Sequence, residues 1–129
     1  MASIFIDIRP KAAPRPRVTR NGTYNDPSYT NYKKTIALQS KNTFKQKDTA
    51  LAMHLEFYFK IPKSWSKEKK ENIPHHTSIP DVDNLTKSIK DALNGIAYKD
   101  DSQVISVFAR KQYGVKDGVM IDIVEIEGN

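Results

Sequence analysis

The stretch Leu51–Ile61, LAMHLEFYFKI, constrains the fold more than any other part of the chain, because apolar side chains occupy every second position. Side chains of a β-strand point alternately to opposite faces of a sheet. The pattern therefore predicts a strand with one buried face. Its buried side chains are predicted to be Leu51, Met53, Leu55, Phe57 and Phe59, and its polar face carries His54, Glu56 and Lys60.

Weaker patterns predict the other elements. Short apolar runs indicate strands at 3–8, 103–113 and 118–127, and helical periodicity indicates helices at 28–44 and 83–94. A short surface helix at 64–73 follows from a polar stretch that Ser64 or Ser66 can cap. A turn near 114–118 suggests that the last two strands form a hairpin. We expect an α+β fold: one domain over 1–129, with a small mixed, partly antiparallel sheet and helices packed on it.

The net charge of +6 comes entirely from the first third of the chain. Residues 1–47 hold ten Lys and Arg against two acidic residues, whereas the remainder holds eleven against thirteen. Four prolines keep most of 9–28 out of regular structure, although Asn21-Gly22 predicts a small hairpin at 17–24. A solvated basic face is the alternative, but this asymmetry favours nucleic acid as a partner. We interpret 9–28 as a basic, proline-rich DNA-binding loop with Lys11, Arg15, Arg17 and Arg20 as its phosphate-binding residues.

Composition excludes several classes of site. The chain has no cysteine, so it can form neither a disulfide nor a thiolate metal site. Its apolar runs are too short to span a bilayer, and the first residues lack the pattern of a secretory signal. We expect a cytoplasmic protein with no membrane partner and no small-molecule cofactor.

The predicted helix at 83–94 has two distinct faces. Its core face is expected to contain Leu85, Ile89, Ala92, Leu93 and Ile96. Lys87 lies about 200° around the helix from Leu85, so it belongs to a polar stripe with Asp83, Asp91 and Asn94. Asp83 and Lys87 are four residues apart and are expected to be neighbours. Asp83 or Asn84 is the expected N-cap, and Asn94-Gly95 the expected stop.

A second acidic residue, Asp81, lies on the same side of the chain as Asp83, just before this helix. Two converging carboxylates offer the hard oxygen ligands that suit Mg²⁺ or Mn²⁺. Asp101 could complete the site if the chain runs back along a helix that is roughly 18 Å long, or it could meet Asp81 and Asp83 of another subunit. The simpler alternative is an N-cap, a surface acidic pair and an ordinary Asp–Lys pair. Two acids on one side of a basic protein favour the metal site.

Such a site next to a DNA-binding loop suggests phosphodiester hydrolysis. A cation held by Asp81, Asp83 and Asp101 would bind the scissile phosphate and lower the pKa of a water. Lys87 could neutralise charge that develops on the phosphate.

The run PDVDNLTKSIKDALNG…KDDSQV resembles the RusA-type Holliday junction resolvases, crossover junction endodeoxyribonucleases of bacteria and their phages. The family pattern is Asp-x-Asp-Asn, a Lys four residues later, Asp-Ala-Leu, and then Asp-Asp-x-Gln-Val. The matching residues here are Asp81, Asp83, Asn84, Lys87, Asp91, Ala92, Leu93 and Asp101. The chain departs from the pattern at Ile79, where relatives often carry a basic residue.

The resemblance implies a homodimer that needs Mg²⁺, with Mn²⁺ able to substitute, and that makes paired symmetric nicks in four-way junction DNA. It implies Asp81, Asp83 and Asp101 as metal ligands, and these three with Lys87 as catalytic residues. It also suggests Lys111 as a phosphate contact, although a lysine on a sheet face is the alternative. Two other functions stay open: a junction-binding protein without catalysis, and a less specific metal-dependent nuclease.

Overall fold

The computed structural model describes residues 2–14, 17–19, 22–24 and 26–128. In chain order the elements are β1 (Ala2–Ile6), β2 (Arg17–Thr19), β3 (Gly22–Tyr24), α1 (Pro27–Ser40), β4 (Leu51–Lys60), α2 (Lys67–Glu71), α3 (Val82–Ala92), the 3-10 turn η1 (Asp101–Gln103), β5 (Val104–Gly114) and β6 (Gly118–Glu125). Each strand and helix expected from the sequence is present, and the ends differ from the predicted ones by a few residues. The mixed α+β character is confirmed.

Four strands form one mixed sheet in the order β1-β6-β4-β5. β4 pairs in parallel with β5 and antiparallel with β6. The predicted hairpin of the last two strands is therefore wrong, because β4 lies between them. The short connection at 115–117 crosses the end of β4, where Asp117 Oδ1 accepts the backbone N–H of Lys60 at 2.8 Å. The backbone N–H and C=O groups of a long strand with a buried face are best hydrogen-bonded at the centre of a sheet, where the strand has a partner on each side.

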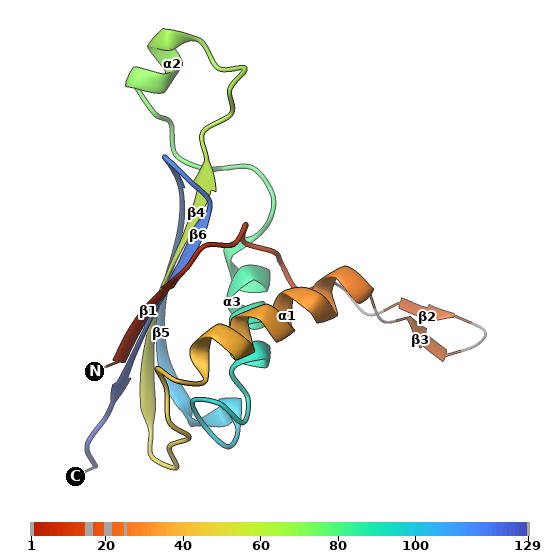
Figure 1. Cartoon of the computed structure of the whole chain (residues 1–129), viewed down its shortest axis with the longest axis vertical. Coiled ribbons are helices and arrows are strands. Elements are labelled where there is room, and N and C mark those ends of the chain that lie inside the picture. Colours follow the sequence, from red (N-terminus) through yellow and green to blue (C-terminus); the bar gives the residue numbers. More distant parts are fainter. Residues whose placement is uncertain (1, 15–16, 20–21, 25, 129) are drawn as a thin grey trace.

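The core lies between this sheet and the two longer helices, as the periodicity predicts. Leu51, Met53, Leu55, Phe57 and Phe59 of β4 are all buried. Buried residues of α1 are Tyr29, Tyr32, Ile36 and Ser40, and those of α3 are Leu85, Ser88, Ile89 and Ala92. Figure 1 shows α1 and α3 on the same side of the sheet. Among the described residues, no helix is long and apolar enough to cross a membrane.

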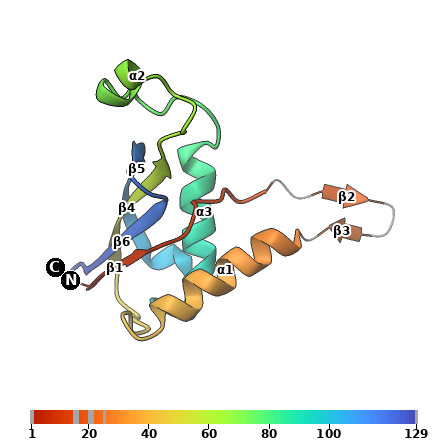
Figure 2. The same cartoon turned by 45° about the horizontal axis from the view of Figure 1, so that its top comes forward.

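The base of the basic segment is attached to α3. Ala13 is buried and donates its backbone N–H to the carbonyl of Asn84 at 2.9 Å. At the other end of the segment, Asp26 caps α1 by accepting the N–H of Ser28 at 3.0 Å. The predicted hairpin between them is confirmed as the antiparallel pair β2–β3, and it projects away from the body of the molecule (Figure 2). The segment is thus anchored beside the first turn of α3.

The connection after α3 holds the next acidic pair near the end of this helix. Leu93 is the C-cap, and Gly95 follows with a φ of +80°, a conformation that glycine adopts at little cost. Tyr98, which the sequence did not single out, is fully buried and donates its hydroxyl to the Lys90 carbonyl at 2.6 Å. The chain therefore passes next to the last turn of α3 at Tyr98 before it reaches Asp101.

Candidate metal and nucleic-acid site

The start of α3 presents two unused carboxylates. The helix begins at Val82 with Asp81 as its N-cap, two or three residues before the predicted caps Asp83 and Asn84. The Asp81 side chain makes no capping hydrogen bond. Asp81 and Asp83 are both exposed. Neither forms an ion pair with another described residue. An aspartate at an N-cap position usually accepts a hydrogen bond from the first turn, but Asp81 does not. The carboxylate oxygens of Asp81 and Asp83 therefore remain available to an external ligand.

A groove of about 560 Å³ runs between α3 and β5. It contains three of the four predicted catalytic residues, and Asp81 is not among its lining residues. The groove is lined by Val82, Asp83, Thr86, Lys87, Lys90, Asp101, Val107 and Ala109. Asp83 and Lys87 of α3 thus line the same surface depression as Asp101, which is distant from them in sequence.

Lys87 contacts Asp91 rather than Asp83, contrary to the predicted pairing. Its Nζ lies 3.2 Å from Asp91 Oδ2. The Tyr29 hydroxyl donates to the same oxygen at 3.2 Å. Burial, followed by the nearby Asp91 carboxylate, raises the pKa of Tyr29 above its ordinary value, so the hydroxyl stays a donor. Asp91 and Tyr29 therefore orient Lys87. The i,i+4 spacing of Lys87 and Asp91 was the sequence signal for their ion pair. No sequence signal indicated the contact of Tyr29 with Asp91, because the helical periodicity indicated only that Tyr29 belongs to the core.

Asp101 is the first residue of η1, and the residues around it are held by hydrogen bonds. Gln103 Oε1 accepts the backbone N–H groups of Lys99 at 2.9 Å and Asp100 at 3.0 Å. The Ser102 hydroxyl donates to Asp100, and this hydrogen bond lowers the pKa of the fully exposed Asp100. Asp100 is thus committed to the turn, which leaves Asp101 as the residue of the pair that lines the groove.

The three predicted metal ligands do not meet within one chain. Among the described residues, no three carboxylate or imidazole side chains are close enough to hold a metal ion. Lys111 on β5 bonds the carbonyl of Pro80 at 3.0 Å, whereas Asp101 directly precedes the first residues of that strand. Val104 and Lys111 are separated by about 23 Å at the usual rise of a strand. Asp81 and Asp83 therefore lie near one end of β5, and Asp101 lies near the other.

The chemistry of the donors still fits a hard divalent cation. Exposed carboxylates without an ion-pair partner are the ligands that Mg²⁺ and Mn²⁺ prefer, and Asp81 and Asp83 lie two residues apart at the start of α3. Within one chain, these two acids are without the third predicted ligand, because Asp101 lies near the other end of β5.

The predicted DNA-binding residues are only partly described. The backbone of Arg17 lies in β2, and Lys11 is partly buried near the anchored base of the segment. Arg15 and Arg20 lie outside the described residues. The Lys111 ammonium is used within the chain, because it donates to the carbonyls of Ser78 and Pro80.

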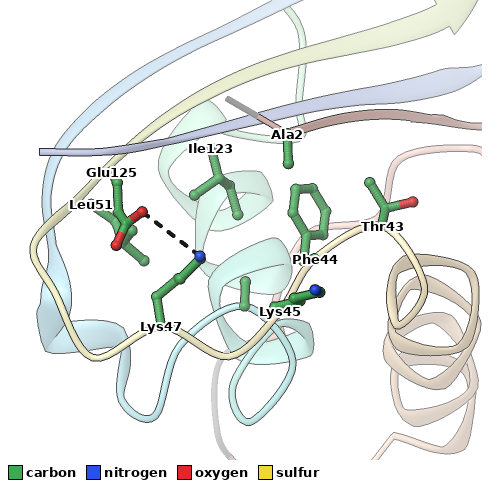
Figure 3. Close-up of a pocket in the computed structure, with 9 residues that line it drawn as sticks. Ala2, Thr43, Phe44, Lys45, Lys47, Leu51, Ile123 and Glu125 are labelled. Atoms are coloured by element: carbon green, nitrogen blue, oxygen red, sulfur yellow. Dashed lines mark ion pairs between the residues drawn. The ribbon is translucent and has the colours of Figure 1, made fainter.

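A second pocket, of about 250 Å³, contains none of these residues (Figure 3). It lies between the segment after α1 and the ends of β4 and β6. One of its cations, Lys47, already pairs with Glu125 at 3.7 Å. The remaining lining residues are Ala2, Thr43, Phe44, Lys45, Leu51, Ala97 and Ile123. The α3–β5 groove is therefore the candidate site.

Comparison with known proteins identifies the family. The family model described as endodeoxyribonuclease RusA matches residues 7–124. The chain is 36% identical over 131 residues to the uncharacterized protein YqaN of Bacillus subtilis (strain 168), covering 91% of each chain. It is also 33% identical over 82 residues to the crossover junction endodeoxyribonuclease RusA of Lactococcus phage r1t, covering 63% of this chain and 59% of the phage protein. The match spans the acids of α3, the groove and Asp101, and the chain belongs to the RusA family of endodeoxyribonucleases.

Proposed function

We propose that this chain is a metal-dependent endodeoxyribonuclease that resolves four-way DNA junctions by paired, symmetric nicks. Family membership supports hydrolysis of DNA, and the phage relative is named for cleavage of crossover junctions. The observation that carries the proposal is the α3–β5 groove, which is lined by Asp83, Lys87 and Asp101. The basic segment, attached through Ala13 and Asn84, begins beside it.

The proposed roles follow from the chemistry of each side chain. Asp81, Asp83 and Asp101 would hold Mg²⁺ or Mn²⁺, which supplies charge stabilisation at the scissile phosphate and acidifies a water. Lys87, oriented by Asp91, would present its ammonium to the charge that develops on the phosphate. Lys11, Arg15, Arg17 and Arg20 would bind the phosphate backbone of the DNA.

We further propose that the enzyme is a homodimer joined along β5, and the exposed surface of this strand supports this. β5 is an edge strand of the sheet, and on it Ile105, Val107 and Phe108 are exposed by 64%, 41% and 59%. Natural edge strands are usually protected by charges, prolines or a covering element. Exposed apolar residues in the first half of this long edge strand favour pairing with another strand, and two symmetric nicks call for two sites related by a two-fold axis.

Antiparallel pairing of two β5 strands would also assemble the acids. One end of β5 lies next to the start of α3, through the Lys111–Pro80 hydrogen bond, and Asp101 precedes the other end. A two-fold axis across the strand exchanges these ends. The partner's Asp101 would therefore lie near Asp81 and Asp83, and each metal site would use both subunits. This is the second of the two arrangements considered for Asp101.

The test is cleavage of a synthetic four-way junction in Mg²⁺, beside a linear DNA duplex and an RNA of matched sequence. We expect paired symmetric nicks in the junction and little cleavage of the duplex. Asp83→Asn should abolish cleavage and retain junction binding measured in EDTA. Junction binding by the wild type without cleavage in Mg²⁺ or Mn²⁺ would instead indicate a binding protein. Equal cleavage of junction, duplex and RNA would indicate a less specific nuclease.

A further inference from the structure

Two side chains at opposite ends of β5 are used to hold loops rather than to face solvent. Gln103 immediately precedes the strand, and Lys111 lies near its far end. The loop next to each of them leads directly into an acid of the proposed site. This inference rests on the proposed function, since it concerns the same carboxylates.

Gln103 uses all the hydrogen-bonding capacity of its amide. Its Oε1 accepts from Lys99 and Asp100, and its Nε2 donates to the carbonyls of Lys47 at 2.8 Å and Thr49 at 2.9 Å. The side chain therefore joins the turn that carries Asp101 to the segment that enters β4. Two acceptor and two donor contacts require an amide; a carboxylate could satisfy only the acceptor half.

Lys111 holds the segment that carries the other two acids. Its ammonium donates to the carbonyls of Ser78 and Pro80, the latter at 3.0 Å. Pro80 directly precedes Asp81, so the contact fixes the backbone at the entry to α3. A lysine has three donors and no acceptor, which suits it to bridge two carbonyl oxygens. A DNA phosphate would have to compete with both of them.

We propose that Gln103 and Lys111 are positioning residues, which set the locations of Asp101 and of the Asp81–Asp83 pair relative to β5. In the proposed dimer, β5 of one subunit lies along β5 of the other, so the distance between carboxylates from two subunits depends on how each loop is attached to this strand. Neither side chain needs to touch DNA or metal for its loss to impair the site. Loss of either attachment would let the carboxylates move apart.

Substitution by methionine tests this, because it keeps the length of each side chain and removes its polar contacts. In Gln103→Met and Lys111→Met we expect the Mg²⁺ concentration for half-maximal junction cleavage to rise about tenfold or more, as for residues that orient metal ligands. Junction binding in EDTA should stay within about twofold of wild type. Matched controls are Gln112→Met and Arg110→Met, whose side chains contact Glu56 on β4; both should keep the wild-type Mg²⁺ dependence.

A readout independent of cleavage is amide hydrogen exchange of the full chain without metal. Lys111→Met should raise exchange in residues 78–83, and Gln103→Met should raise it in 98–102, with the rest of β5 unchanged. The conservative variants Lys111→Arg and Gln103→Glu keep the inference testable if methionine lowers the folded population. Lys111→Arg should retain most protection. Gln103→Glu should retain the protection of the Lys99 and Asp100 amides, which a carboxylate can still accept, and lose only the attachment to the carbonyls of Lys47 and Thr49.

Three outcomes overturn the inference. If Lys111→Met loses junction binding in EDTA while its Mg²⁺ dependence is unchanged, Lys111 is a DNA contact rather than a positioning residue. Unchanged exchange in both loops shows that the contacts do not hold them. Equal effects in the Gln112 and Arg110 controls show a general effect on the sheet. If wild type cleaves nothing, the proposed function fails by itself, while the exchange measurements still decide whether the two side chains position these loops.

Discussion

At the residue scale, Lys87 depends on Asp91 for its orientation. The ammonium is held at 3.2 Å by Asp91, which also accepts the Tyr29 hydroxyl. We expect Lys87→Met to lower the cleavage rate by about 10²–10³-fold, the usual cost of removing a group that stabilises developing charge. Asp91→Asn should lower the cleavage rate by a smaller factor, because it weakens only the orientation of Lys87. The double variant should be no slower than Lys87→Met, which single-turnover cleavage of a four-way junction measures.

The control for this prediction is Lys41→Met, which removes the same charge from an exposed residue just after α1. It should leave cleavage close to wild type. The Lys87 side chain is 61% exposed, and exposed ion pairs contribute at most about 1 kcal/mol to folding. Melting temperatures of the Lys87 variant should therefore stay near wild type. Additive effects of the two substitutions would show that Asp91 does not act through Lys87.

At the element scale, the buried face of α3 holds the acids and Lys87 in place. Leu85 and Ile89 are fully buried, on the side of the helix away from the groove. We expect Leu85→Ala to lower the free energy of unfolding by about 2–5 kcal/mol, through lost burial and a residual cavity. Leu38→Ala on α1 should change it by less than about 0.5 kcal/mol, because Leu38 is 63% exposed. Urea denaturation measures both, and equal losses would contradict the assignment of these faces.

The segment between β4 and α3 should be sensitive to acid. His76 stacks on Tyr113 and contacts Phe59, with ring centroids 4.6 Å apart in each case. Burial, followed by the nearby Lys111 and Arg9 cations, lowers the pKa of His76 from its ordinary value of 6.5. The folded state thus favours the neutral ring. Stability from this contact is complete above the ordinary pKa and is lost as the pH falls below it.

Trp65 reports on this transition, because it is the one tryptophan of the chain and its ring lies 4.7 Å from that of Tyr113. We expect its fluorescence to change between about pH 7 and pH 5, the range in which histidine titrates. His76→Phe should remove the change and preserve the stack. A persistent transition in His76→Phe would assign it to another group.

At the scale of the whole molecule, mixed dimers distinguish the two arrangements of the acids. Suppose each site combines Asp83 of one subunit with Asp101 of the other. A dimer of one Asp83→Asn subunit and one Asp101→Asn subunit then contains one intact site and one with both substitutions. We expect the mixture to recover single nicks in the junction, although each variant alone is inactive. No recovery would place all three acids of a site in the same subunit.

The control for mixing is Asp83→Asn combined with Asp81→Asn. Both substitutions affect the acids at the start of α3, so every mixed site lacks one of them and no activity should return.

Analytical ultracentrifugation of Val107→Lys should show a shift from dimer to monomer, because Val107 is exposed on the edge strand. A dimer that persists in this variant would place the interface elsewhere.

Local periodicity was sufficient to predict most of the elements and their buried faces. The alternating side chains of β4 and the apolar faces of α1 and α3 are buried as expected, because the period of the apolar pattern reflects which side of an element leaves water. The acids, Lys87 and the basic segment were also evident in the sequence, because their chemistry and spacing do not depend on the rest of the fold.

Pairing between distant segments could not be predicted in this way. The insertion of β4 between β5 and β6, the contact of Asp91 with Tyr29, and the separation of Asp101 from Asp81 and Asp83 all depend on long-range packing. Alternative strand orders bury the same faces, and a lysine side chain can reach either neighbour on its helix. The sequence by itself therefore determined which residues form the core and which are the candidates for the chemistry, while the tertiary structure alone decided which of them lie together.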